Sequence, residues 1–157
     1  MKRRQPLPTR WLVADERAGE QLWAAVRKLP LGSGVLVLHR SLPKGERAAL
    51  LSKLRRIARQ RGLVIADEAA GASARVHDLA ELRRASLRRT RLLFLSPMFA
   101  TRSHPGWKAL PRMKAAAMIR LAPMPVLALG GMNERRFRRV ERLGFQGWAG
   151  IDAWIRT

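Results

Sequence analysis

Short apolar runs alternate with amphipathic helical patterns along almost the whole chain of 157 residues. Most of the runs are continuous, with no polar residue between apolar ones, which is typical of parallel strands buried on both faces. They predict strands at residues 11–14, 35–38, 63–66, 92–95, 126–129 and 148–151, and a weaker seventh at 74–77.

The segments between the runs predict helices with recognisable ends. Asp78, followed three residues later by Glu81, resembles a capping box that opens one helix. Asn133 caps an expected long final helix that ends at Gly144. The other clear helical patterns lie at 43–62 and 110–121, the second of which ends before two prolines.

Alternating strands and helices predict an α/β fold with a parallel sheet, either doubly wound and open or closed into a barrel. An eight-unit barrel usually needs at least about 200 residues. The eleven residues 68–78 cannot hold a helix, a strand and a second helix. We therefore expect a single domain, 1–157, that lacks about one βα unit and has residues 1–9 as a flexible tail. A barrel of this kind is open beside Asp67, and its unpaired strand edge favours a homodimer.

Arginine and lysine dominate the charge, with 32 basic against 11 acidic residues and a formal net charge of +21. Such a balance indicates either nucleic-acid binding or arginine on the outer faces of helices. No aromatic platform of the kind that single-strand binders require is interleaved with the basic clusters, so we expect only non-specific nucleic-acid binding. The chain has no cysteine, and no run approaches the roughly 18 apolar residues of a membrane span. These features predict a cytoplasmic protein with no membrane contact.

Candidate ligand-binding groups follow the predicted strands, at the end where parallel α/β folds build their sites. Gly130 and Gly131 follow the strand at 126–129 and allow a phosphate to approach the backbone, although a tight turn alone also explains them. The long loop 96–106 offers hydroxyl and cationic side chains that suit a phosphate or diphosphate: Thr101, Arg102, Ser103 and His104.

Two further strand ends carry residues with two interpretations each. His77 is placed as a general base, or it caps the next helix or pairs with Asp78. Asp67 is placed as a Mg²⁺ ligand, or it forms a salt bridge with a nearby arginine. The three histidines do not have the spacing of a zinc site.

Three segments together resemble the thiamine-phosphate synthase and thiazole tautomerase family. Residues 97–106 are similar to its Pro-x-Phe-x-Thr-x-Thr/Ser-Lys loop, and residues 125–132 to its Pro-Val-x-Ala-Ile-Gly-Gly-Ile strand. Residues 144–151 are similar to its closing Gly-Ala-x-Gly-Val-Ala-Val-Ile strand. The resemblance implies a TIM barrel, here with roughly seven parallel strands.

The resemblance implies an enzyme of thiamine biosynthesis. A synthase of this family, a transferase, condenses hydroxymethylpyrimidine diphosphate with thiazole phosphate, releasing pyrophosphate. By this likeness Asp67 holds Mg²⁺. The phosphate-binding residues implied are Arg40, Thr101, Ser103, His104, Gly130 and Gly131. In the tautomerase branch, His77 is the proton-transfer base and no metal is needed.

Several motif positions depart from the family pattern, so we expect impaired synthase activity. Leu38 and Leu42 stand where the family has Gln and Lys, and Ala66 where it has Asn. The unit with the second Mg²⁺ carboxylate has no counterpart between Asp67 and Ser73. The alternatives are a metal-independent tautomerase or a non-catalytic barrel that binds phosphorylated ligands or nucleic acid.

Overall fold

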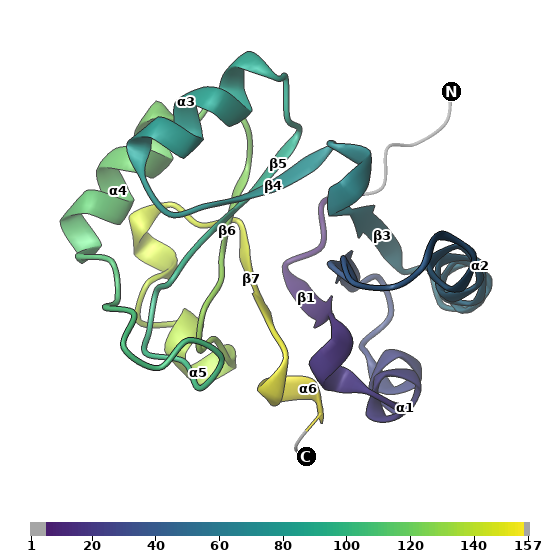
Figure 1. Ribbon diagram of the computed structural model, residues 1–157. Coiled ribbons are helices and arrows are strands. Elements are labelled where there is room, and N and C mark those ends of the chain that lie inside the picture. Colours follow the sequence, from purple (N-terminus) through teal and green to yellow (C-terminus); the bar gives the residue numbers. More distant parts are fainter. Residues whose placement is uncertain (1–5, 156–157) are drawn as a thin grey trace.

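The computed structural model describes residues 6–155, which form one sheet of seven parallel strands (Figure 1). The spatial order is β3-β2-β1-β7-β6-β5-β4, and every neighbouring pair is parallel. The strands are β1 (Arg10–Ala14), β2 (Gly34–Val37), β3 (Val64–Asp67), β4 (Ser73–Val76), β5 (Leu92–Leu95), β6 (Val126–Ala128) and β7 (Gly147–Gly150). All seven predicted strands are confirmed to within one residue at each end.

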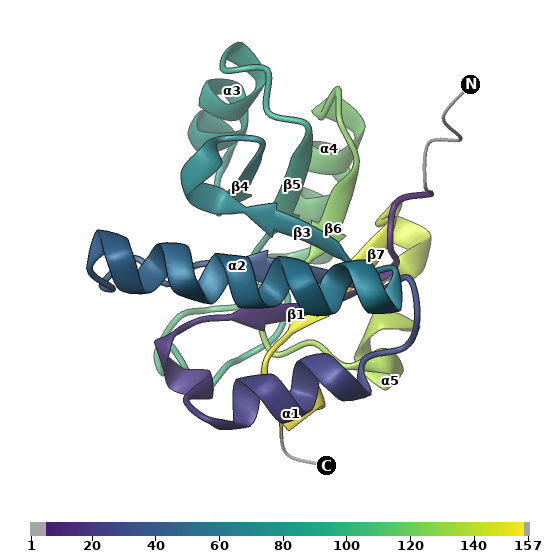
Figure 2. The same cartoon turned by 90° about the vertical axis from the view of Figure 1, so that its right-hand side faces the viewer.

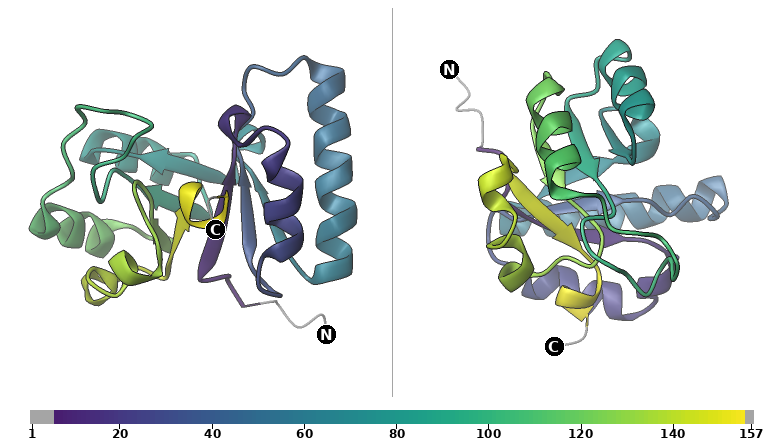
Figure 3. Two further views of the ribbon diagram at one scale, coloured as in Figure 1. Left: turned by 90° about the horizontal axis from the view of Figure 1, so that it is seen from below. Right: turned by 90° about the vertical axis from the view of Figure 1, so that its left-hand side faces the viewer.

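Helices cover the outer face of the sheet in two groups. The first packs on β1 and β2, where α1 and α2 lie side by side (Figures 2 and 3). The second packs on β5 and β6. The helices are α1 (Gln21–Lys28), α2 (Lys44–Arg61), α3 (Leu79–Leu87), α4 (Arg112–Leu121), α5 (Glu134–Phe137) and α6 (Asp152–Ile155), with short 3-10 turns η1 (Glu16–Ala18), η2 (Glu68–Ala70) and η3 (Glu141–Leu143). Within residues 6–155 no helix combines the length and apolar character that a bilayer crossing requires.

The inner face of the sheet packs against itself and makes the fold TIM-barrel-like. Trp11 of β1 and Phe94 of β5 are fully buried, and their rings meet edge to face with centroids 5.6 Å apart. The Trp11 indole N–H is satisfied by the Pro8 carbonyl at 2.7 Å. Gly34 provides the space for this ring, since a Cβ there would lie 2.1 Å from it. Opposite strands therefore meet across an interior filled by side chains.

The barrel is open between β3 and β4, as the length of the chain predicts. These strands are consecutive in the chain, yet they are the two edges of the sheet. Only η2 and two further loop residues before Ser73 connect them. In Figure 1 the two strands diverge from the short turn that joins them, and they do not pair.

The predicted helix ends are largely confirmed, with one exception in the last long helix. Gly62 ends α2 in the left-handed conformation, and the Asp78 side chain caps α3 at the Glu81 N–H. The expected helix 133–144 is wrong, because α5 ends at Phe137 and only η3 follows. Five arginines between 135 and 142 repel one another at helical spacing, and the buried Val140 leaves helical geometry.

Part of the predicted N-terminal tail packs on the barrel. Residues 1–5 lie outside the described residues. Leu7 packs against the inner core, and the Thr9 carbonyl accepts a hydrogen bond from the Trp148 N–H at 2.9 Å. Gly147 allows this approach, because a Cβ there would lie 2.2 Å from the Thr9 oxygen. Residues 6–9 therefore belong to the folded barrel.

We expect Gly34→Ala to destabilise the chain, because the added methyl group overlaps the Trp11 ring. Overpacking of this kind costs about 1–3 kcal/mol in the free energy of unfolding. Gly45→Ala in α2 is the matched control, since no atom lies within 4 Å of its added Cβ. Urea unfolding measures both variants, and equal stabilities would contradict the packing of Gly34 on Trp11.

The unpaired edges of β3 and β4 lead us to expect a homodimer. Exposed strand edges offer free N–H and C=O groups to another chain. The charge of +21 opposes self-association, so the dimer should become stronger as added salt screens this repulsion. Sedimentation over a range of protein and salt concentrations tests this, and a monomer under every condition would refute it.

Candidate functional site

A pocket of about 770 Å³ lies at the carboxyl ends of the strands. Loops that follow all seven strands contribute its walls, as expected for a parallel barrel. Seven of the eight site residues expected from the sequence line it: Arg40, His77, Thr101, Ser103, His104, Gly130 and Gly131. The eighth, Asp67, does not line it.

The glycine pair after β6 forms a tight turn against the loop that follows β5. Both glycines have positive φ angles, +95° at Gly130 and +60° at Gly131. A Cβ on Gly131 would lie 2.5 Å from the Ala100 carbonyl oxygen, so this contact requires glycine. The Phe99 N–H donates to the Gly130 carbonyl at 3.1 Å. No described residue accepts a hydrogen bond from the N–H of either glycine, which leaves two donors beside the pocket.

The loop after β5 carries hydroxyl, cationic and aromatic groups along the pocket wall. The Thr101 hydroxyl accepts a hydrogen bond from the Ser103 N–H at 3.0 Å, which gives this part of the loop a defined turn. Trp107 is half exposed and lies between two histidine rings, 5.3 Å from His77 and 4.3 Å from His104. The sequence patterns did not point to Trp107, because only the folded loop brings it to β4.

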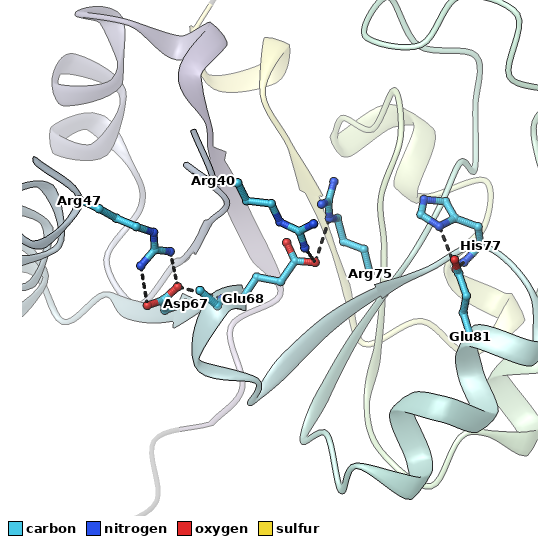
Figure 4. A network of polar contacts seen from close by, with 8 residues as sticks. Arg40, Arg47, Asp67, Glu68, Arg75, His77 and Glu81 are labelled. Carbon is cyan, nitrogen blue, oxygen red and sulfur yellow. Dashed lines mark hydrogen bonds and ion pairs between the residues drawn. The ribbon is translucent and has the colours of Figure 1, made fainter. Parts of the chain in front are cut away.

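His77 is held by Glu81, not by its neighbour Asp78. The His77 ring Nδ1 lies 2.9 Å from the Glu81 carboxylate, which also accepts the His77 backbone N–H at 2.6 Å (Figure 4). An ionised carboxylate only accepts hydrogen bonds, so Nδ1 carries the proton and Nε2 is the basic nitrogen. The sequence pattern predicts only a helix-capping role for Glu81. Its spacing of four residues from His77 is the signal for this pair.

Asp67 forms a two-pronged ion pair with Arg47 of α2. The distances are 3.1 and 2.5 Å, and both side chains are largely buried (Figure 4). The hydrogen bonds from Arg47 hold the pKa of Asp67 below its ordinary value. Of the two interpretations of Asp67, the geometry favours the salt bridge.

The residues present do not fit the expected Mg²⁺ ion. Both oxygens of Asp67 are occupied by Arg47, and its Oδ1 also accepts the Ala69 N–H at 3.1 Å. Within residues 6–155, no three acidic or histidine side chains gather as a metal site. A Mg²⁺ site needs carboxylate oxygens that are free to coordinate the ion.

Glu68 bridges two arginines at the open side of the barrel. Arg40 Nη2 and Arg75 Nε each lie 3.1 Å from the same Glu68 oxygen, Oε1 (Figure 4). The Glu68 side chain is only 8% exposed, and its Oε2 is buried without a hydrogen-bond partner among the described residues. Arg40 therefore lines the pocket, but it is already paired with a carboxylate.

A second carboxylate holds the loop that carries Arg40. Glu16 accepts hydrogen bonds from the Ser41 hydroxyl at 2.6 Å and from the Ser41 N–H at 3.0 Å. These bonds lower the pKa of Glu16 to about 2, with the hydroxyl bond as the largest cause. The loops after β1 and β2 are therefore tied together at the edge of the pocket.

The Asp67–Arg47 pair predicts a loss of stability in acid. Folding lowers the pKa of Asp67 from 3.8, so its contribution is complete above that pH and is lost as pH falls through the lower folded value. When the pH is lowered from about 6 to about 3, we expect the free energy of unfolding to fall less in Asp67→Asn than in the parent. Urea unfolding at both pH values tests this, with exposed Glu141→Gln as control. An equal loss in all three proteins would contradict it.

The chain is similar to proteins of one known family in both sequence and fold. The sequence profile of the family described as thiamine monophosphate synthase (TMP-TENI) matches residues 56–154. No curated protein matches the chain. The solved structure of thiamine phosphate pyrophosphorylase from Pyrococcus furiosus is similar, with a TM-score of 0.78 and 18% identity over 95% of this chain and 88% of that chain. This identity shows a shared fold alone. The profile match covers well over half of the residues, so the chain belongs to the thiamine monophosphate synthase family.

Proposed function

We propose that the chain catalyses metal-independent proton transfer on a phosphorylated thiazole, the tautomerase reaction of its family. The observation that carries this proposal is the His77–Glu81 pair, whose histidine lines the pocket beside Trp107. The ion pair of Asp67 with Arg47 supports a reaction without a metal.

The phosphate of the ligand binds between the loops after β5 and β6. The unpaired N–H groups of Gly130 and Gly131 support this position, because backbone donors at such turns bind anions. Thr101 and Ser103 supply hydroxyl groups from the facing loop, and His104 adds a donor or a positive charge. This arrangement leaves the ring of the ligand on the His77 side of the pocket.

His77 acts as the proton carrier. Its Nδ1–H donates to Glu81, so Nε2 takes a proton from the saturated ring carbon of the non-aromatic tautomer and returns it to the exocyclic carbon next to the ring, which makes the ring aromatic. One C–H bond breaks and another forms, so no oxidant, metal or second substrate is required. Positioned acid–base groups typically supply about 10²–10⁴-fold in rate. Trp107 forms a flat wall beside this histidine, which suits a planar ring.

The synthase reaction is the second candidate, and membership of the family favours it. It condenses hydroxymethylpyrimidine diphosphate with thiazole phosphate, and Arg40 and Thr101 line the pocket where that chemistry requires cations and hydroxyls. Mg²⁺ would assist pyrophosphate departure, but the paired Asp67 offers it no free carboxylate. We therefore expect this activity to be weak and dependent on added Mg²⁺.

His77→Asn separates the two candidates. Asparagine keeps an N–H near the Nδ1 position and removes the basic Nε2. We expect isomerisation of a non-aromatic thiazole phosphate tautomer, followed by absorbance in EDTA, to fall about 10²–10⁴-fold in this variant. Calorimetric binding of thiazole phosphate should persist, since the phosphate contacts are unchanged.

The proposed tautomerase would be refuted by isomerisation that requires Mg²⁺ or that survives in His77→Asn. Formation of thiamine phosphate from both substrates at a rate above isomerisation would place the synthase first. If the parent protein binds thiazole phosphate but shows neither activity, it is a non-catalytic binding protein.

A further inference from the structure

We propose that Glu68 is a specificity-determining residue that keeps a second anionic group out of the pocket, so that the chain selects monophosphates over diphosphates. This inference deepens the proposed function, because it relies on a phosphorylated ligand in the same pocket. It concerns the side of the pocket next to the barrel opening, away from the glycine turn after β6.

Three elements bring the groups together at this position. Arg40 follows β2, Glu68 follows β3, and Arg75 lies on β4 (Figure 4). All three residues line the pocket. Arg75 Nε donates a hydrogen bond to Oε1 of Glu68 at 3.1 Å, and Arg40 Nη2 forms an ion pair with the same oxygen at 3.1 Å. Two arginines converging on one oxygen are an arrangement that proteins use for carboxylate and phosphate.

Glu68 occupies the position that an external anion would take. Its single negative charge is set between two positive charges, and its carboxylate is almost fully buried. A phosphate group entering there must either displace this carboxylate or stand beside it with like charge, which is unfavourable at short range. Glu68 therefore neutralises part of the positive charge that the two arginines present to a ligand, although the Arg40 side chain itself is 68% exposed.

The backbone around Glu68 keeps the carboxylate in place. Asp67, the preceding residue, is held by Arg47, and Glu68 begins the single turn of η2. Gly71 ends that turn in the left-handed conformation, two residues before β4. The short connection that leaves the barrel open thus directs Glu68 towards the pocket.

The environment of the second carboxylate oxygen argues against a purely stabilising role. Oε2 is buried and has no hydrogen-bond partner among the described residues. A buried oxygen left without a donor weakens the fold compared with a fully bonded one. Excluding a second anion explains why a carboxylate lies here although its Oε2 has no hydrogen-bond donor.

Calorimetric titration with inorganic phosphate and with pyrophosphate tests the proposal at physiological salt. The proteins are the parent, Glu68→Gln and the control Glu141→Gln, an exposed site that undergoes the same change in net charge. We expect Glu68→Gln to bind pyrophosphate at least about tenfold more tightly than the parent, because both arginines become available. Affinity for inorganic phosphate should change less than about threefold, and the control should match the parent.

Two results would overturn the proposal. One is a Glu68→Gln protein that binds pyrophosphate no more tightly than Glu141→Gln. The other is a parent protein that already prefers pyrophosphate about tenfold and loses that preference in Arg40→Ala. Should Glu68→Gln unfold, as judged by its melting temperature, Arg75→Gln provides the second measurement. It should leave pyrophosphate binding weak, because Glu68 still neutralises Arg40.

These titrations need no turnover, so their outcome is independent of the reaction. Failure of the Glu68 proposal would leave isomerisation by His77 untouched. Loss of isomerisation with a normal gain of pyrophosphate binding would instead remove the proposed function alone.

Discussion

The connection between β3 and β4 is the constraint on which the rest of the structure depends. It is too short to hold a further strand and its helices, so the ring of backbone hydrogen bonds is interrupted at this place. Side chains span the opening instead, through the bridge of Arg40, Glu68 and Arg75. The barrel still encloses a packed interior, because Trp11 and Phe94 meet across it. The packed interior therefore closes the bottom of the pocket, and the ionic wall, formed by Arg40, Glu68 and Arg75, closes one side of it.

That ionic wall changes the chemistry the pocket supports. In the described part of the chain, the two carboxylates at the end of β3 and directly after it, Asp67 and Glu68, are neutralised by arginines, and neither is free to bind a metal. Arginine thus has a local role here, since Arg40, Arg47 and Arg75 pair with acids that would otherwise attract cations. Among the groups that line the pocket, His77 has an orientation determined by Glu81. Proton transfer is the chemistry that this combination favours.

Local patterns predicted the strands and most helix ends correctly, because their physical causes are local. Continuous apolar runs can be buried on both faces only in a covered parallel sheet. Gly62 and Asp78 act through their own backbone and the adjacent turn. The prediction of a long final helix was wrong, and only one of its two causes is local. Its arginine repulsion is visible in the chain, but the burial of Val140 against the barrel is not.

The sequence by itself determined the seven strands, the opening after β3 and the face on which the candidate ligand-binding residues gather. It did so because strand periodicity and connection length follow from the chain alone. Only the tertiary structure decided which side chains contact one another. Arg47 pairs with Asp67, Glu68 lies between two arginines, and Trp107 packs beside His77. Those contacts join residues from different strands and loops, and the curvature of the barrel sets which of several nearby charges meet. Electrostatic pairing depends on distances of a few ångströms, which no spacing along the chain specifies.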